Sequence, residues 1–137
     1  MRLALLLALC LPVSAQAPTT VDYGKACGGS LLLMTLPKIG EVVDVTVLND
    51  DATAGLVAVG FAQVKIFMGG TAPHRCYLLV DPFALVPFTS LGGNGSAKLF
   101  TLPNNTSLVG VTFFVQAVSF DTSANSWTQG IRATVGL

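Results

Sequence analysis

Short apolar runs, separated roughly every 10 to 15 residues by glycine, proline, asparagine or aspartate, make up most of this sequence and limit how it can fold. In the clearest run, residues 42–48, valines alternate with an aspartate and a threonine. This period of two puts Val43, Val45 and Val47 on one face of a β-strand. Beyond the first residues, no stretch repeats with the period of an α-helix. The pattern therefore predicts about eight short strands.

A chain built only of strands buries its apolar faces by stacking two sheets or by closing one sheet into a barrel. We expect a short polar lead at residues 16–26, followed by one all-β domain at residues 27–137. The expected fold is a single antiparallel β-sandwich with Greek-key or jelly-roll-like connections. Pro87 interrupts the run 83–88, which favours a sheet edge or an extended loop there. Residues 92–95, Gly-Gly-Asn-Gly, predict a turn.

Residues 1–15 predict a cleavable signal peptide for secretion. Arg2 supplies the early positive charge, and the apolar run 3–11 is followed by proline and small residues that end at Ala15. This run is about half of the roughly 20 residues needed to span a bilayer, so no transmembrane segment is expected after cleavage. Cys10 leaves open a lipid-anchored form. We therefore expect an extracytoplasmic protein, either secreted or at the cell surface.

Two cysteines, Cys27 and Cys76, remain once the signal is removed. An even pair in an exported chain predicts a disulfide bond. Closing a loop of about 50 residues removes unfolded-chain entropy worth about 4 kcal/mol. The alternative is a pair of unbonded, buried thiols. A zinc site is not expected, because His74 is the only histidine and no third sulfur ligand remains.

Charged residues form only 10% of the chain, and its formal net charge is zero. A protein that binds nucleic acid needs a dense basic patch to neutralise phosphates. The basic residues that follow the signal are instead spread singly along the sequence, as Lys25, Lys38, Lys65, Arg75, Lys98 and Arg132. Nucleic acid is therefore not an expected partner.

The residues needed for catalysis are not grouped in this sequence. A serine or cysteine nucleophile needs a base, usually histidine, and His74 lies in a turn-like segment beside Arg75, where an exposed loop position is expected. The acidic residues fall mostly in turns rather than in pairs along strands. We expect no enzymatic activity and no cofactor, with a small secreted hydrolase as the least favoured alternative.

Aromatic residues with polar neighbours are the candidates for ligand binding. Trp127 and Tyr77 could stack on sugar rings, although a single tryptophan more often belongs to a core. The only metal candidates are the oxygen ligands of Asn49, Asp50 and Asp51, which suit calcium. Three adjacent side chains cannot all point inward, so no metal site is expected.

Several short pieces occur in a set order along the chain: Tyr23-Gly24, Cys27-Gly28-Gly29, residues 36–40, Leu48-Asn49, Arg75-Cys76-Tyr77-Leu78, Asp81-Pro82, residues 113–117, Asp121 and residues 134–136. Together they resemble an uncharacterised secreted domain that recurs in exported proteins of planctomycete-type bacteria. The resemblance covers nearly the whole chain after the signal. It implies a disulfide-linked β-sandwich at an extracellular or surface location, and it implies no activity.

These observations together predict a non-enzymatic secreted or cell-surface module with an adhesive or structural role in the cell envelope. Its expected partners are envelope proteins or glycans. The alternative is a carbohydrate-binding module that uses Trp127.

Overall fold

The structure, a computed structural model, describes residues 15–48, 53–120 and 125–137. These residues form an all-β fold with one short 3₁₀ turn, η1, at Thr106–Leu108. The strands are β1 (Thr19–Tyr23), β2 (Leu31–Met34), β3 (Val42–Leu48), β4 (Ala54–Gly60), β5 (Ala62–Gly69), β6 (Cys76–Asp81), β7 (Ala84–Leu91), β8 (Asn94–Thr101), β9 (Thr112–Phe120), β10 (Ser126–Trp127) and β11 (Gly130–Thr134).

The expected number of about eight strands is too low, because the described residues contain eleven. One extra strand, β1, lies within residues 16–26, which were expected to be a polar lead. All of β1 pairs with β11, and Asp22 and the threonines of β1 give it no apolar run from which a strand could be predicted. Another, β10, has only two residues and pairs with β9.

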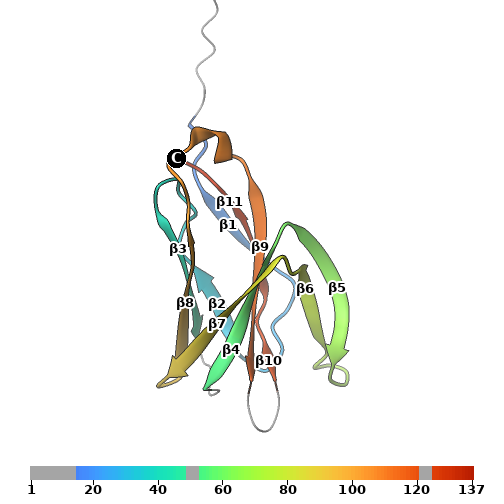
Figure 1. The fold of residues 1–137 in the computed structure, drawn as a ribbon. Helices are drawn as coiled ribbons and strands as arrows, with labels where there is room; N and C mark the ends of the chain where they lie inside the picture. Colours follow the sequence, from blue (N-terminus) through green and yellow to red (C-terminus); the bar gives the residue numbers. More distant parts are fainter. Residues whose placement is uncertain (1–14, 49–52, 121–124) are drawn as a thin grey trace, which may run out of the picture.

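Nine strands form one antiparallel sheet in the order β1-β11-β9-β4-β7-β8-β3-β2, with β10 attached to β9. The sheet curls on itself into a nearly closed, barrel-like shell, so that β3 and β8 face β9 and β11 across the interior (Figure 1). The predictions of an all-β fold and of antiparallel pairing are confirmed. The hydrogen-bonded path runs without a break through the large sheet, whereas two stacked sheets were expected.

The hydrophobic core fills the inside of this shell. Val43, Val45 and Val47 are fully buried there, as the alternation along β3 predicts. Other strands, and the residues directly after β8 and β11, contribute further buried apolar side chains, namely Leu32, Val57, Val59, Phe88, Leu102, Phe113, Val115, Ala117, Ile131, Ala133 and Val135. The burial of these side chains is the main source of stability for the fold.

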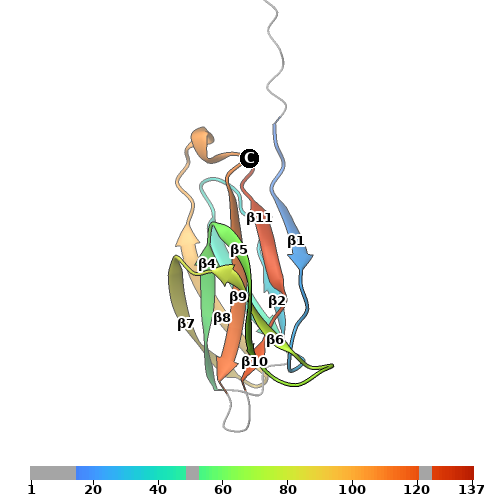
Figure 2. The same cartoon turned by 90° about the vertical axis from the view of Figure 1, so that its right-hand side faces the viewer.

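β5 and β6 form a separate two-stranded hairpin, which lies outside the shell, beside β4 and β9 (Figure 2). Since β4 and β9 have the core on one face and the hairpin near the other, most of their residues are buried. Gln116, on the outer face of β9, fixes the hairpin. Its side-chain oxygen accepts from the N–H of Leu79 at 2.8 Å, and its nitrogen donates to the carbonyl of Tyr77 at 3.0 Å.

Pro87 lies inside a strand rather than in a loop. β7 pairs with β4 at Pro87, whereas its pairing with β8 starts only at Thr89. Proline has no N–H to donate, and it is tolerated here because one side of the strand is unpaired at this position. The predicted turn at residues 92–95 is confirmed in part: Gly92 and Gly93 join β7 to β8 with φ of +64° and +87°, values that favour glycine.

None of the described residues belongs to a helix long and apolar enough to cross a membrane.

Candidate functional site

The β5–β6 hairpin is the least covered part of the molecule and has a hollow on each of its faces. In the described part of the chain β5 pairs with β6 alone, and most of its side chains are exposed. Ile66, Phe67 and Met68 are 51%, 56% and 48% exposed. Phe67 lies opposite Tyr77 across the hairpin, with 5.9 Å between the ring centres, and Ile66 lies opposite Leu78.

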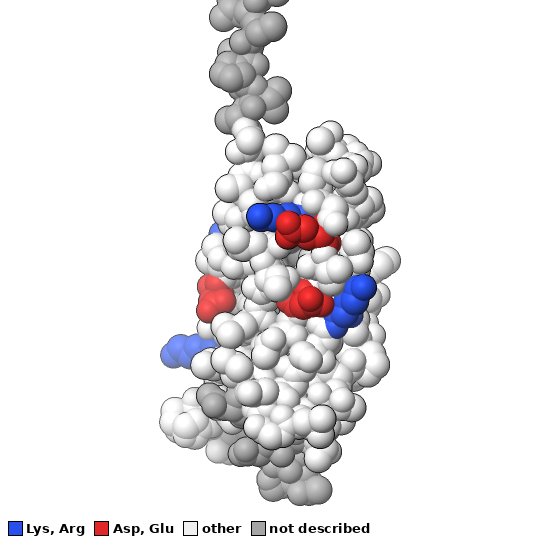
Figure 3. All heavy atoms as spheres, turned by 90° about the vertical axis from the view of Figure 1, so that its left-hand side faces the viewer, with Lys and Arg blue, Asp and Glu red and all other residues white. Residues whose placement is uncertain are grey.

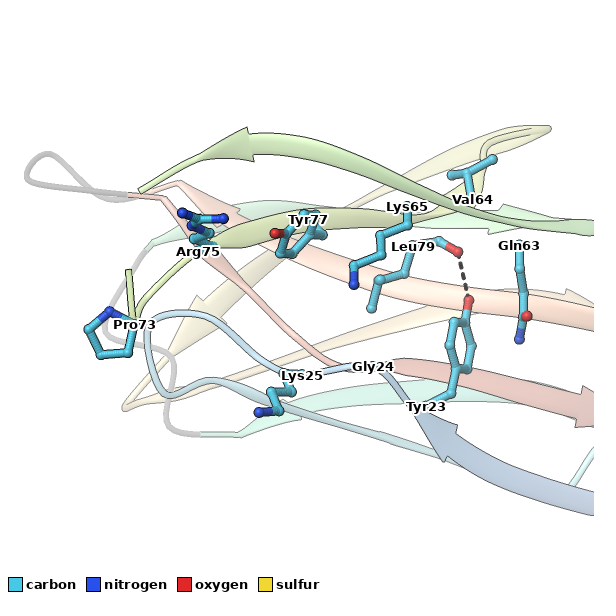
Figure 4. Close-up of a pocket in the computed structure, with 10 residues that line it drawn as sticks. All are labelled: Tyr23, Gly24, Lys25, Gln63, Val64, Lys65, Pro73, Arg75, Tyr77 and Leu79. Carbon is cyan, nitrogen blue, oxygen red and sulfur yellow. Dashed lines mark hydrogen bonds between the residues drawn. The ribbon is translucent and has the colours of Figure 1, made fainter. Parts of the chain in front are cut away.

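One hollow, here called the basic cavity, has a volume of about 580 Å³ and lies between the hairpin and the segment that follows β1 (Figure 4). It is lined by Tyr23, Gly24, Lys25, Gln63, Val64, Lys65, Pro73, Arg75, Tyr77 and Leu79. Among the described residues, the lining contains three cationic side chains and no carboxylate. By contrast, the face drawn in Figure 3 carries few charged groups of both signs, with acidic groups beside basic ones on a largely uncharged surface.

The disulfide bond determines which residues meet in the basic cavity. Cys27 and Cys76 are bonded, as predicted, across 49 positions of sequence. Lys25 lies two residues before Cys27, and Arg75 directly precedes Cys76, so the bond brings these two cations to the same place. The backbone of Cys27 is itself held, because it exchanges two hydrogen bonds with Trp127 at 2.6 and 2.7 Å.

Lys65 reaches the same cavity from β5. Its ammonium nitrogen lies 4.9 Å from the centre of the Tyr77 ring, a cation–π contact. Within the described ranges none of the three cations, Lys25, Lys65 and Arg75, has a carboxylate partner within 4.0 Å. The described walls of the cavity therefore concentrate positive charge.

Tyr23 closes one end of the basic cavity. Its hydroxyl donates a hydrogen bond to the carbonyl of Leu79 at 2.9 Å, as the dashed line in Figure 4 shows. Its ring packs edge-on against Phe114 at 5.9 Å and lies directly over Gly130, where a Cβ would clash with it. Burial raises the pKa of Tyr23 to about 12. Tyr23 is thus neutral at physiological pH and ties β1 to the hairpin.

The second hollow, here called the apolar cleft, lies between the other face of the hairpin and the outside of the shell. Its volume is about 360 Å³. Met68 and Leu78 line it from the hairpin, and Trp127 lines it from β10. The rest of its wall is largely apolar and consists of Leu56, Ala58, Pro82, Leu85, Gln116, Ala117, Val118, Phe120 and Asn125.

The two aromatic candidates from the sequence do not form one site. Tyr77 lines the basic cavity, whereas Trp127 lines the apolar cleft. His74 is exposed in the loop between β5 and β6, and its backbone N–H donates to the carbonyl of Thr71 at 2.7 Å.

The calcium candidates Asn49, Asp50 and Asp51 lie outside the described residues, as do Cys10 and most of the expected signal. Among the residues that are described, no three His, Cys, Asp or Glu side chains gather as metal ligands would.

The sequence does not reveal the basic cavity, because the basic residues are spread singly along it. The structure brings Lys25, Lys65 and Arg75 together. One signal for two of them was present, since each lies within two residues of a cysteine expected to form the disulfide. Lys65 gave no such signal, because its place depends on the pairing of β5 with β6.

Comparison with known proteins finds no matching family model, no matching curated protein and no matching solved structure. The resemblance to a secreted planctomycete-type domain stays a prediction.

Proposed function

We propose that the protein is a non-enzymatic module, secreted or at the cell surface, that assembles in the envelope by pairing its β5 edge with β5 of a second copy. The observation that carries this proposal is the exposure of three consecutive large apolar side chains, Ile66, Phe67 and Met68, on an edge strand. Successive residues of a strand point to opposite faces, so β5 presents apolar surface on both sides of its open edge. Such an edge is a template for another strand.

Two other strand edges, those of β6 and β2, support the choice of β5, because glutamine side chains already bond to their backbone groups. The inner edge of β6 is capped by the side chain of Gln116, and the edge of β2 is capped at Leu32 by the side chain of Gln129. Among the described residues no side chain caps β5 in this way. β5 also carries a single charged residue, Lys65, so two copies can approach with little repulsion. A pair of identical strands about a two-fold axis is self-complementary.

Size-exclusion chromatography with light scattering, over a range of concentrations, tests the proposal. We expect the native protein to form a dimer and Ile66→Lys to remain a monomer, because a charge on an edge strand opposes pairing. Leu91→Lys is the matched control, since Leu91 is 87% exposed at the turn between β7 and β8. A native protein that stays monomeric and retains nothing from an envelope extract would contradict the proposal.

A second candidate function, carbohydrate binding, is favoured by the position of Trp127. This side chain is only half-buried and lines an open cleft beside the amide of Asn125. Aromatic rings next to polar groups bind sugars by stacking and hydrogen bonding. A neutral-glycan array tests this candidate, with Trp127→Ala as the variant and Leu91→Ala as the control. The absence of a signal, or an equal signal from Trp127→Ala, removes it.

A further inference from the structure

We propose that the basic cavity binds an acidic oligosaccharide, whose carboxylate or sulfate group lies between Lys25, Lys65 and Arg75. Positive charge is concentrated in this cavity. Three of the six basic residues that follow Arg2 line it, and none of the described residues in its wall is acidic. Like charges gathered in a hollow raise the local potential and attract anions.

The chemistry of the cations matches an oxyanion rather than a simple counter-ion. An arginine presents a planar fork of N–H donors that fits a carboxylate or sulfate, and a lysine ammonium adds a compact charge. Arg75 and both lysines are exposed, so their donors are free to turn toward a ligand. In the described part of the chain no carboxylate competes with the ligand for them.

The size and lining of the cavity indicate more than one sugar. Its volume of about 580 Å³ exceeds what a bare ion needs and is ordinary for an organic ligand. A neighbouring hollow of about 470 Å³ shares Arg75 and Tyr77 with it. This neighbouring hollow, which is distinct from the apolar cleft, also has the ring of Phe67 in its wall. Aromatic rings are typical contacts for sugars. The two hollows are therefore neighbours on the hairpin, with Arg75 and Tyr77 in the walls of both.

The walls of the basic cavity are held in place without a ligand. The disulfide bond joins the segments of Lys25 and Arg75, and Gln116 fixes the backbone on both sides of residue 78. Tyr23 adds its hydrogen bond to Leu79. A site whose walls are already ordered loses little entropy on binding. The site lies on a face of the hairpin, so it does not depend on pairing at the β5 edge.

Titration of the isotope-labelled, oxidised protein with tri-galacturonate, followed by amide NMR, tests the proposal. We expect shifts at residues 63–65 and 75–79, and binding at least about tenfold tighter than that of the uncharged methyl ester. A second titration uses a sulfated trisaccharide in place of tri-galacturonate. Stronger shifts of the same residues by this probe assign sulfate as the anion of the site.

Lys65→Gln and Arg75→Gln should each weaken binding by about tenfold, because each removes a charged donor. Lys98→Gln is the control, since Lys98 is equally exposed but lies on β8 outside the cavity. The amide spectrum of each free variant shows whether it is folded. The proposal is overturned if neither charged probe shifts these residues, if the ester binds equally well, or if Lys98→Gln weakens binding as much as Lys65→Gln.

Discussion

The side chain of Gln129 pairs with the backbone of Leu32 as a neighbouring strand would. Its oxygen accepts from the N–H of Leu32 at 3.1 Å, and its nitrogen donates to the carbonyl of Leu32 at 2.8 Å. Both residues are buried, with exposed fractions of 8% and 0%. A side-chain amide has the same donor and acceptor as a peptide group. Gln129 directly precedes β11. Its side chain thus links β2, at one end of the curled sheet, to a strand near the other end.

Replacement of Gln129 by alanine should lower the free energy of unfolding by about 2–4 kcal/mol, because it leaves a buried N–H and a buried carbonyl without partners. Urea denaturation measures the loss. Gln63→Ala, at an exposed position of β5, is the control and should change stability little. A loss as small as that of the control would show that water satisfies Leu32.

Replacement of Gln116 by leucine should loosen the hairpin while the shell stays folded. Gln116 is 1% exposed, and it bonds to Leu79, Tyr77 and the carbonyl of Thr128. Hydrogen exchange at the amide of Leu79 should therefore accelerate, whereas exchange at Val45 in the core should not. Equal acceleration at both amides would mean that the hairpin and the shell unfold as one unit.

Removal of the disulfide by Cys27→Ser and Cys76→Ser together should lower the stability of the protein by about 4 kcal/mol, the chain entropy of a loop of this length. It should also weaken binding of tri-galacturonate, since Lys25 and Arg75 are no longer tied together. Intact mass before and after reduction and alkylation checks the bond itself. Free cysteines in the native protein would refute it.

One tyrosine should titrate near pH 12, the value to which burial raises the pKa of Tyr23 from 10.0. Below pH 10 the folded and unfolded chains both carry a neutral phenol. Between pH 10 and 12 the unfolded chain ionises first, so the folded state loses stability as the pH rises. Ultraviolet absorbance of tyrosinate follows the titration, and Tyr23→Phe should abolish this step. If that variant still titrates near pH 12, another group is responsible.

The fold was predictable where local pattern decides it. Val43, Val45 and Val47 revealed a core strand, and the glycines of residues 92–95 revealed a hairpin turn. β1 was not predictable, since its strand character comes from pairing with β11 rather than from apolar residues. Gln116 and Gln129 were missed for a related reason: in a sequence they look like surface residues, and only the packed structure shows the backbone groups that they satisfy.

The candidate site was less accessible to prediction than the fold. Trp127 and Tyr77 each line a hollow, but the two hollows lie on opposite faces of the hairpin. The convergence of Lys25 and Arg75 depends on the disulfide bond, which the sequence predicts. The place of Lys65 depends on the pairing register of β5 with β6, which spacing along the chain does not encode.

The cystine has a consequence for where the proposed ligand site can exist. The curled sheet has its own core and hydrogen bonds, whereas Lys25 and Arg75 are held together by the bond between Cys27 and Cys76. In a thiol-rich, reducing compartment such as the cytoplasm this bond would open. The polypeptide would keep its shell there but lose the alignment of its cations. The proposed site would then be complete only in an oxidising compartment, where the bond can form.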